Sequence, residues 1–291
     1  MDAAVLRSFL AIAELGNMTY AADSLHISQP ALSMQIKRLE EELGTKLFER
    51  RSRYMELTPN GKLLKDRALV IVGLMDKTVS EFKTIDDAIG GEIRLGCPES
   101  PQVSVVASAF ASFHKTAPLS RLDITSGSTE HLFYLLHNDL LDAALIVEPP
   151  SLDRYEYIEI PGEDTWGVLM TKDDPLASLD AISADDLQDR DIIISRQSLK
   201  NDLPRWSEGK IKEHQVVGFY NLVYNATHLV HEKLGVMLCF DWLVNTETHP
   251  ELTFRPITPT LSNKMYLVWQ KQQTFTPVAL RFIEHLRATL K

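Results

Sequence analysis

Apolar residues recur every three or four positions through the first 43 residues, which is the period of an amphipathic helix. The pattern predicts a first helix within 1–17 and two short helices within 19–43. Ser28 is a typical N-cap and Pro30 suits the first turn after it, so the last of these helices should begin there. Its apolar residues are expected to form one buried stripe, made of Leu32, Ile36, Leu39 and Leu43.

The other side of this last helix is left free for a partner. At about 100° per residue, the side chains that point away from the buried stripe are those of Pro30, Ser33, Met34 and Lys37. A short helix, a tight turn and a second helix with such an outer face match the docking geometry of a helix-turn-helix on DNA. An ordinary helical hairpin would show the same periodicity and is the alternative.

A short basic loop follows Gly44. Arg50, Arg51 and Arg53 lie between apolar anchors in the run LFERRSRYMELT, which is the composition of a β-wing whose arginines meet phosphates or a narrow minor groove. Residues 28–67 hold nine Lys/Arg against six Asp/Glu, although the whole chain carries a net charge of −10. A basic loop alone is usually a solvated surface, but beside a helix-turn-helix it predicts contact with double-stranded DNA.

A third pattern begins at Thr58, which would cap a helix whose first turn holds Pro59. Beyond it, steps of four and three alternate, a period of about 3.5 residues that predicts a coiled-coil seam. The seam consists of Leu64, Ala68, Ile71, Met75, Thr78, Phe82, Ile85 and Ile89. We expect this helix to pair with a second copy and to end at Gly90-Gly91, the alternative being a seam that packs on its own chain.

From Glu92 onward, short apolar runs alternate with amphipathic segments, which indicates strands and helices in a largely parallel sheet. Strands are predicted at 93–97, 119–125, 143–147, 166–171, 192–195, 216–220, 236–240 and 265–270. Helices are predicted at 103–114, 129–138, 222–233 and 277–289. The last strand and helix would return to the first set, giving two α/β lobes with a cleft between them, a common site for small ligands.

Two loops after successive strands carry the same polar pattern. Ser100-Pro101 and the run from Ser126 to Thr129 would each cap a helix whose free backbone N–H groups and partial positive charge favour an anion. The alternative is that each side chain only caps its own helix. Glu99 and Glu148 lie near the same strand ends and would oppose a simple dianion, so a zwitterion is as credible a ligand as a carboxylate.

The stretch from residue 21 to residue 61 also resembles a known family. Its pattern, AAxxLxxSQPALSxxIxxLEEELGxxLFxRxxRxxxLTxxG, is similar to the amino-terminal signature of LysR-type transcriptional regulators. The resemblance is dense to about residue 61 and weaker afterwards. It implies a winged helix-turn-helix, a linker helix that pairs antiparallel with that of a second copy, and an effector domain of two subdomains. Tetramers are usual in this family.

The resemblance also implies which residues meet DNA and effector. The DNA-binding residues would be Thr19, Ser28, Gln29, Pro30, Ser33, Met34, Lys37, Arg50 and Arg53. The effector-binding residues would be Ser100, Gln102, Ser128, Thr129, Glu148, Ser198 and Asn225. Met34 departs from the family, which often has a basic or polar residue there. A thioether cannot make a bidentate contact to a base, so readout at this position should be apolar or absent.

Together these patterns predict an α/β chain of three parts. Residues 1–58 would form the winged helix-turn-helix, 59–90 the linker and dimerisation helix, and 91–291 the effector-binding domain. Within the last part, lobe I would hold about 91–161 and 266–291, and lobe II about 162–265. The expected protein is a sequence-specific transcriptional regulator whose operator binding responds to a small effector. It would be a homodimer through the linker helix and, by resemblance, a homotetramer.

The composition agrees with this picture. With 291 residues, 44% of them hydrophobic, the chain can bury more than one core, and no apolar run reaches the roughly 18 residues of a membrane span. The start lacks the basic-then-apolar plan of a secretory signal, and two distant cysteines suit a reducing compartment. We therefore expect a soluble cytoplasmic protein without membrane contact. A two-lobed solute-binding protein without a regulatory role is the alternative for the carboxyl-terminal part.

Catalytic and metal-binding patterns are absent from the sequence. It has no GxSxG, P-loop or HExxH pattern, so we expect neither an enzyme nor a resident cofactor. His228 and His231 lie three apart on a predicted helix but lack a third ligand, which argues against a metal site. Cys97 ends a predicted strand at the cleft, and we interpret it as a small buried hydrophobic residue rather than a redox sensor.

Overall fold

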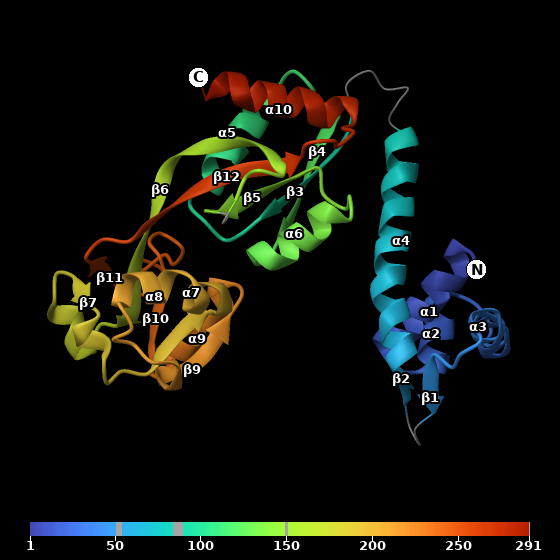
Figure 1. Cartoon of the computed structure of the whole chain (residues 1–291), viewed down its shortest axis with the longest axis horizontal. Coiled ribbons are helices and arrows are strands. Elements are labelled where there is room, and N and C mark those ends of the chain that lie inside the picture. The colour runs from blue at the N-terminus through green and yellow to red at the C-terminus, as the bar shows by residue number, and fades with distance from the viewer. Residues whose placement is uncertain (51–53, 84–89, 149–150, 291) are drawn as a thin grey trace. The chain divides into compact units, whose positions relative to one another are not determined.

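The structure is a computed structural model that describes residues 1–50, 54–83, 90–148 and 151–290. The chain divides into two compact units, Met1–Asp86 and Asp87–Lys291, and each has its own hydrophobic core. Figure 1 shows helices and a short hairpin in the first unit and two groups of strands in the second.

Three helices surround the core of the first unit. They are α1 (Ala3–Leu15), α2 (Met18–Ser24) and α3 (Gln29–Leu43), and their N-caps are Asp2, Asn17 and Ser28. Each cap side chain accepts a hydrogen bond from a backbone N–H in the first turn, which satisfies a donor that the helix itself leaves unpaired. Ala21 and Ala22 are buried in the core, where their small side chains allow the helices to pack closely.

The buried stripe of α3 is shorter than its periodicity predicts. Leu32, Ile36 and Leu39 are buried, as predicted. Leu43 is 41% exposed, so the prediction that it completes the stripe is wrong. The physical reason is that α3 ends at Gly44. Its φ of 66° lies in the left-handed region that favours glycine, and the chain turns away from the core there.

A two-stranded antiparallel sheet follows α3. Strands β1 (Phe48–Arg50) and β2 (Met55–Leu57) pair Phe48 with Leu57, which is the geometry predicted for a wing. Glu40 of α3 joins this sheet to the helix. Its buried carboxylate accepts hydrogen bonds from the backbone N–H groups of Leu47 (2.9 Å) and Phe48 (3.4 Å).

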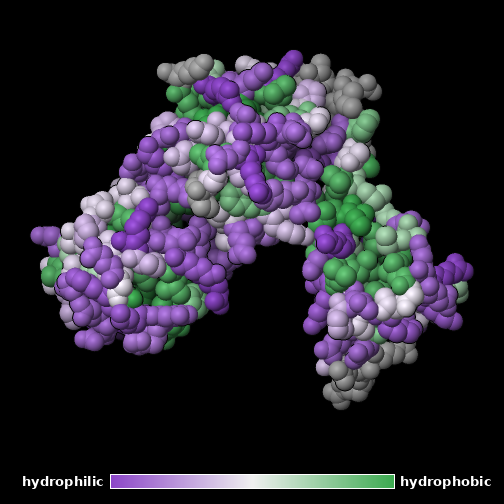
Figure 2. All heavy atoms as spheres, in the orientation of Figure 1, coloured by the Kyte–Doolittle hydropathy of each residue, from purple (hydrophilic) through white to green (hydrophobic). Residues whose placement is uncertain are grey.

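Helix α4 (Pro59–Lys83) completes the first unit. Thr58 caps it as predicted, because its hydroxyl accepts a hydrogen bond from the N–H of Gly61 at 3.0 Å. Ala68 is buried in the core of the same unit and Leu64 packs against that core, so the start of the predicted seam packs on its own chain. Later seam residues are exposed, and Figure 2 shows apolar side chains on the surface of α4; these residues are Ile71, Met75, Thr78 and Phe82. Ile85 and Ile89 lie outside the described residues.

The second unit consists of two α/β lobes that share two strands (Figure 1). Lobe I contains β3 (Gly91–Cys97), α5 (Val103–His114), β4 (Ser120–Ser126), α6 (Thr129–His137), β5 (Ala143–Val147) and α10 (Pro277–Thr289). Lobe II contains β7 (Ile182–Ser183), β8 (Ile192–Ser195), α7 (Arg196–Lys200), α8 (Asp202–Ser207), β9 (Val216–Tyr220), α9 (Val223–His231), β10 (Val236–Phe240) and β11 (Leu252–Thr258). The shared strands are β6 (Tyr155–Thr171) and β12 (Ser262–Gln270), which pair antiparallel.

Parallel pairing dominates within each lobe, whereas the shared strands pair antiparallel. The order along the sheet is β4-β3-β5-β12-β6-β10-β8-β9, with β11 paired to β6 and β7 paired to β11. Strand β3 lies parallel to β4 and β5 in lobe I, and β8 lies parallel to β9 and β10 in lobe II. Separate apolar clusters fill the two lobes, so each lobe is stabilised independently and the crossing strands position one against the other.

Every strand and helix predicted for the second unit is present within a few residues, but β6 begins at Tyr155 rather than at residue 166. The first half of β6, YEYIEI, alternates exposed glutamates with buried or aromatic residues. It therefore lacks the continuous apolar run by which the other strands were predicted. Helices α7 and α8 and strand β11 were also not predicted. They are short, and β11 contains Pro256, which weakens a strand pattern.

We predict that Glu40 holds the wing to α3. Replacing Glu40 by Ala leaves the buried N–H of Leu47 unpaired, which should cost about 1–3 kcal/mol of local stability. Hydrogen exchange of the amides in α3, β1 and β2 measures this loss. The matched control is Glu41→Ala, which removes only an exposed pair with Lys37, worth about 0.3–0.5 kcal/mol. Equal protection in both variants would show that Glu40 does not brace the wing.

Candidate functional site

The first unit presents the opening turns of α3 to solvent. The residues predicted to meet DNA from this helix lie at exposed or half-buried positions: Ser28, Gln29, Pro30, Ser33, Met34 and Lys37. Met34 is 53% exposed, so this surface carries a large apolar side chain. Lys37 pairs with Glu41 one turn later at 3.7 Å, which leaves its ammonium at the surface. Thr19 is exposed on α2, while Arg53 and the side chain of Arg50 lie outside the described residues.

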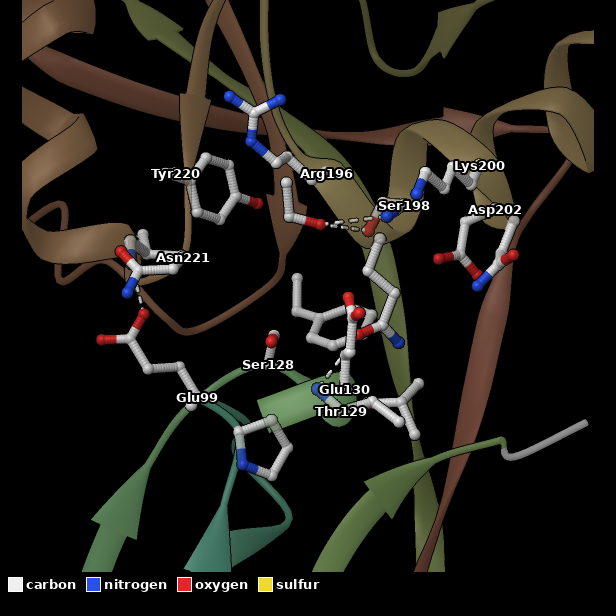
Figure 3. A pocket seen from close by; sticks show the side chains of 18 of the residues that line it. Glu99, Ser128, Thr129, Glu130, Arg196, Ser198, Lys200, Asp202, Tyr220 and Asn221 are labelled. Carbon is white, nitrogen blue, oxygen red and sulfur yellow. Dashed lines mark hydrogen bonds between the residues drawn. The ribbon is translucent and has the colours of Figure 1, made fainter. Parts of the chain in front are cut away.

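A cavity of about 1010 Å³ lies between the two lobes of the second unit (Figure 3). Lobe I contributes the loop after β3 and the first turns of α6, and lobe II contributes α7 and the end of β9. Polar side chains from both lobes point into this space. Aromatic rings line much of the remainder, namely Phe133, Tyr134, Trp166, Phe219, Tyr220 and Phe240. A large concave site of this kind, with a few convergent polar groups, suits a small molecule.

Four of the residues predicted to bind effector line this cavity: Ser128, Thr129, Glu148 and Ser198. The remaining three, Ser100, Gln102 and Asn225, do not, contrary to the expectation from the sequence. Ser100 is buried, and its hydroxyl donates to the carboxylate of Asp164 on β6 while accepting from the N–H of Gln102 at 2.9 Å. Asn225 is exposed on α9. The cap pattern was visible in the sequence, but the direction in which each side chain points depends on these long-range partners.

Helix α7 supplies cavity residues that the sequence analysis missed. Ser195, the last residue of β8, caps this helix. This is the same order of strand, serine and helix that singled out Ser128, so the run SRQSLK did carry a signal. Arg196 and Lys200 bring positive charge to the cavity wall. The guanidinium carbon of Arg196 lies 4.1 Å from the ring centroid of Phe219, a cation–π contact.

Two hydrogen bonds join the lobes across this cavity. The N–H of Thr129, the first residue of α6, donates to Oε1 of Gln197 at 3.3 Å. The N–H of Val223, the first residue of α9, donates to the carboxylate of Glu99. Each lobe therefore supplies an acceptor to the start of a helix in the other lobe, where unpaired N–H groups and partial positive charge favour it.

A buried amide connects the lobes beside the crossing strands. Nδ2 of Asn263 on β12 donates to Glu148 at 3.0 Å and to Asp202 at 3.2 Å, and its Oδ1 accepts from the indole N–H of Trp166 at 2.5 Å. Glu148 also accepts from Arg205 at 3.3 Å. The Glu148 carboxylate thus already has hydrogen-bond donors within the protein, and these contacts stabilise the wall of the cavity.

Burial changes the titration of several groups near the cavity. It raises the pKa of the Asp202 carboxyl, although the hydrogen bond from Asn263 lowers it in part. Burial also raises the pKa of the Cys97 and Cys239 thiols to about 12, so both are protonated at neutral pH. A thiolate is the reactive form of cysteine, and Cys97 is buried in the core of lobe I, as the sequence analysis expected.

Within the described part of the chain, no three His, Cys, Asp or Glu side chains come together as metal ligands. His231 instead lies 2.7 Å from Glu251, and the ring of His228 packs edge-on against Tyr224. Among the described residues there is also no helix both long and apolar enough to cross a membrane.

Two family patterns match the chain. The one described as "Bacterial regulatory helix-turn-helix protein, lysR family" matches residues 4–62, and the one described as "LysR substrate binding domain" matches residues 86–291. The chain belongs to the LysR family of transcriptional regulators. This family consists of regulators rather than enzymes, which agrees with the expectation from the sequence.

Several curated relatives are named as regulators. The chain is 33% identical over 190 residues to the HTH-type transcriptional regulator BudR of Raoultella terrigena, covering 65% of this chain and 66% of BudR. It is 32% identical over 184 residues to the HTH-type transcriptional regulator CysL of Bacillus subtilis, covering 63% and 61%. These matches span less than two thirds of either relative's length. Another relative, the Hca operon transcriptional activator HcaR of Escherichia coli, is 26% identical over 97% of this chain and 96% of its own.

Solved structures show the same fold over the full chain. CbnR, a LysR family transcriptional regulator, superposes with a TM-score of 0.75 at 18% identity and covers 100% of both chains. Full-length CbnR in complex with its target DNA gives a TM-score of 0.72 at 19% identity, covering 99% of this chain and 100% of CbnR. The predicted architecture is thereby confirmed: an amino-terminal helix-turn-helix, a long helix and a two-lobed α/β domain.

We predict that Asp164 destabilises the second unit as the pH rises. Burial raises the pKa of this carboxyl above its unfolded value of 3.8, so the native state holds the proton more tightly than the unfolded chain. Stability from this group is therefore complete below the unfolded pKa and is lost as the pH rises through the folded pKa. Asp164→Asn does not titrate, so its free energy of unfolding should increase relative to that of the parent as the pH rises above 3.8.

The control for this prediction is an exposed aspartate of the same unit. A hydrogen bond from Lys210 at 2.7 Å lowers the pKa of Asp185, so Asp185→Asn should lose stability relative to the parent as the pH rises. Urea unfolding at a series of pH values measures both variants. A difference between Asp164→Asn and the parent that does not change with pH would refute the assignment.

Proposed function

We propose that this protein is a cytoplasmic DNA-binding regulator whose operator affinity changes when a small effector occupies the cavity between its lobes. The observation that carries this proposal is the pairing, in one chain, of an exposed α3 surface matched by a helix-turn-helix pattern with a two-lobed unit that encloses a large cavity. The helix-turn-helix match argues against a solute-binding protein without a regulatory role.

We infer that α3 enters the major groove with its first turns against base edges. Gln29, Pro30, Ser33 and Met34 would face the bases, of which Gln29 can form a bidentate contact to adenine and Met34 an apolar contact to a thymine methyl group. Thr19, Ser28 and Lys37, with Arg50 and Arg53 of the wing, would contact phosphates or the minor groove. The likeness to a structure of CbnR with its target DNA supports the docking class but not the operator sequence.

The sorting of these contacts predicts different responses to salt. Lys37→Ala should weaken all DNA sequences alike and lower the magnitude of the salt slope by about one, because a single phosphate contact is lost. Gln29→Ala should weaken the cognate operator by about 1–3 kcal/mol and leave the salt slope unchanged. Fluorescence anisotropy with cognate and scrambled duplexes measures both. If Lys37→Ala weakens the cognate duplex alone, this side chain reads bases.

We propose that α4 forms a homodimer interface through its exposed stripe. At about 100° per residue, Ile71, Leu74, Met75, Thr78 and Phe82 fall on one side of α4 and are exposed, whereas Ala68, earlier on the same side, is buried in its own core. A stripe of large exposed apolar residues is a liability in a lone helix and suits a second copy. A homotetramer would need a further interface in the second unit and rests on family resemblance.

Substitutions on this stripe should separate the dimer. Ile71 is 37% exposed and Met75 is 45% exposed, so Asp at both positions leaves the fold of the first unit intact but places charges in the interface at a cost of several kcal/mol. We expect a monomer by analytical ultracentrifugation at micromolar concentration. Leu69→Asp is the control, because Leu69 is 51% exposed on another side of α4 and should remain dimeric. A dimeric double variant contradicts the interface.

For the effector we propose a carboxylate or zwitterion whose anionic group lies at the start of α6. Ser128 and Thr129 place their hydroxyl groups there, and Lys200 adds a positive charge from lobe II. The anionic group would replace Gln197 as the acceptor of the Thr129 N–H. Because Glu148 is already satisfied by Asn263 and Arg205, it supports the site rather than binding the ligand directly. An ammonium group of a zwitterion would be balanced by the remaining acidic side chains of the cavity wall.

A screen of monocarboxylates and amino acids by thermal shift tests this assignment. A compound at 100 times its dissociation constant should stabilise the protein by about 2.7 kcal/mol. Thr129→Val removes one hydroxyl from the cavity and should weaken the compound found by about tenfold, whereas Asn225→Ala, outside the cavity, should bind it like the parent. The same compound should change operator affinity about 5–150-fold. Stabilisation by neutral or cationic compounds alone would overturn the assignment.

A further inference from the structure

The start of α9 lacks a cap from its own lobe. Its N-cap residue is Leu222, whose apolar side chain accepts no hydrogen bond. A helix of nine residues leaves several N–H groups unpaired at this end, and a capping side chain normally satisfies one of them. In this protein the acceptor comes from lobe I: the carboxylate of Glu99 accepts the N–H of Val223 (Figure 3).

Glu99 reaches α9 from a loop that is itself held firmly. It follows β3 by two residues, and Ser100 next to it is buried and bonded to Asp164 of β6. The position of the carboxylate is thus set by lobe I, while the helix end that it occupies belongs to lobe II. Gln197 makes the opposite contact, from lobe II to the N–H of Thr129.

We propose that Glu99 is a resident anion of the cavity, which joins the two lobes and keeps the start of α9 from any other carboxylate. Two consequences follow. Separation of the lobes would replace the Glu99 carboxylate on the Val223 N–H by water, so the contact favours the arrangement in which the lobes are joined. A second anionic group on an effector would meet the charge of Glu99, so an effector's carboxylate is directed to α6 instead. This second consequence rests on the proposed effector role of the cavity, whereas the first does not.

Amide hydrogen exchange of the full chain, with formate as the probe, tests the proposal. Glu99→Ala should expose the Val223 amide and raise its exchange rate on the order of tenfold. Millimolar formate should restore the protection in Glu99→Ala, because it supplies the missing carboxylate. In the parent, formate should change nothing, since Glu99 already occupies the site. Glu99→Gln keeps an oxygen acceptor without the charge and should fall between the two.

The control variant is Glu130→Ala. Glu130 lines the same cavity from α6, and among the described residues it has no hydrogen-bond or ion-pair partner. This variant should leave the exchange of Val223 unchanged with and without formate. Normal exchange in Glu99→Ala, failure of formate to restore it, or equal protection of the parent by formate would each overturn the proposal.

Spin labels distinguish a latch between lobes from a simple helix cap. Lys115 in lobe I and Asp189 in lobe II are exposed, and labels on cysteines introduced there report the distance between lobes. The two native cysteines are buried and remain unlabelled. The distance distribution should broaden in Glu99→Ala and narrow again with formate. An unchanged distribution would refute the latch. None of these measurements needs DNA or an effector, so their failure leaves the proposed regulatory function standing.

Discussion

The amide of Asn263 is the contact on which the arrangement of the second unit depends. Only β6 and β12 cross between the lobes in the described part of the chain, and each lobe has its own core, so apolar packing alone does not fix their relation. Asn263 on β12 holds Glu148 of lobe I and Asp202 of lobe II with a single Nδ2 group. Loss of the amide would remove a donor that Glu148 and the buried Asp202 share, leaving Arg205 as the side chain that contacts both carboxylates.

Helix α4 illustrates how one periodic pattern can serve two partners. The seam read from the sequence treats its residues alike, but Ala68 is buried in the first unit whereas Met75 is exposed. A period near 3.5 shows only that one side of a helix is apolar. Which turns of that side meet their own chain depends on the length of α1 and the position of the wing, and neither follows from local sequence.

Local signals in the sequence located most elements, and the errors arise where a partner is distant. Ser28 capped α3 as predicted because a cap acts within one turn. Ser100 shows the same local pattern, but Asp164, 64 residues away, draws its hydroxyl out of the cavity. Glu99 looked like a charge that opposes an anionic ligand, and its bond to α9 could not be foreseen because it spans 124 residues. Side-chain direction, rather than element identity, limited the prediction of the site.

The buried carboxyl of Asp164 helps to position the loop between β3 and α5. Its Oδ1 has no hydrogen-bond partner among the described atoms, and a buried polar atom without a partner costs stability. Its other oxygen holds Ser100, which in turn accepts the N–H of Gln102 and fixes the first turn before α5. Glu99 lies in this same loop. A buried carboxylate on a crossing strand therefore helps to set the position of the loop whose Glu99 side chain reaches lobe II.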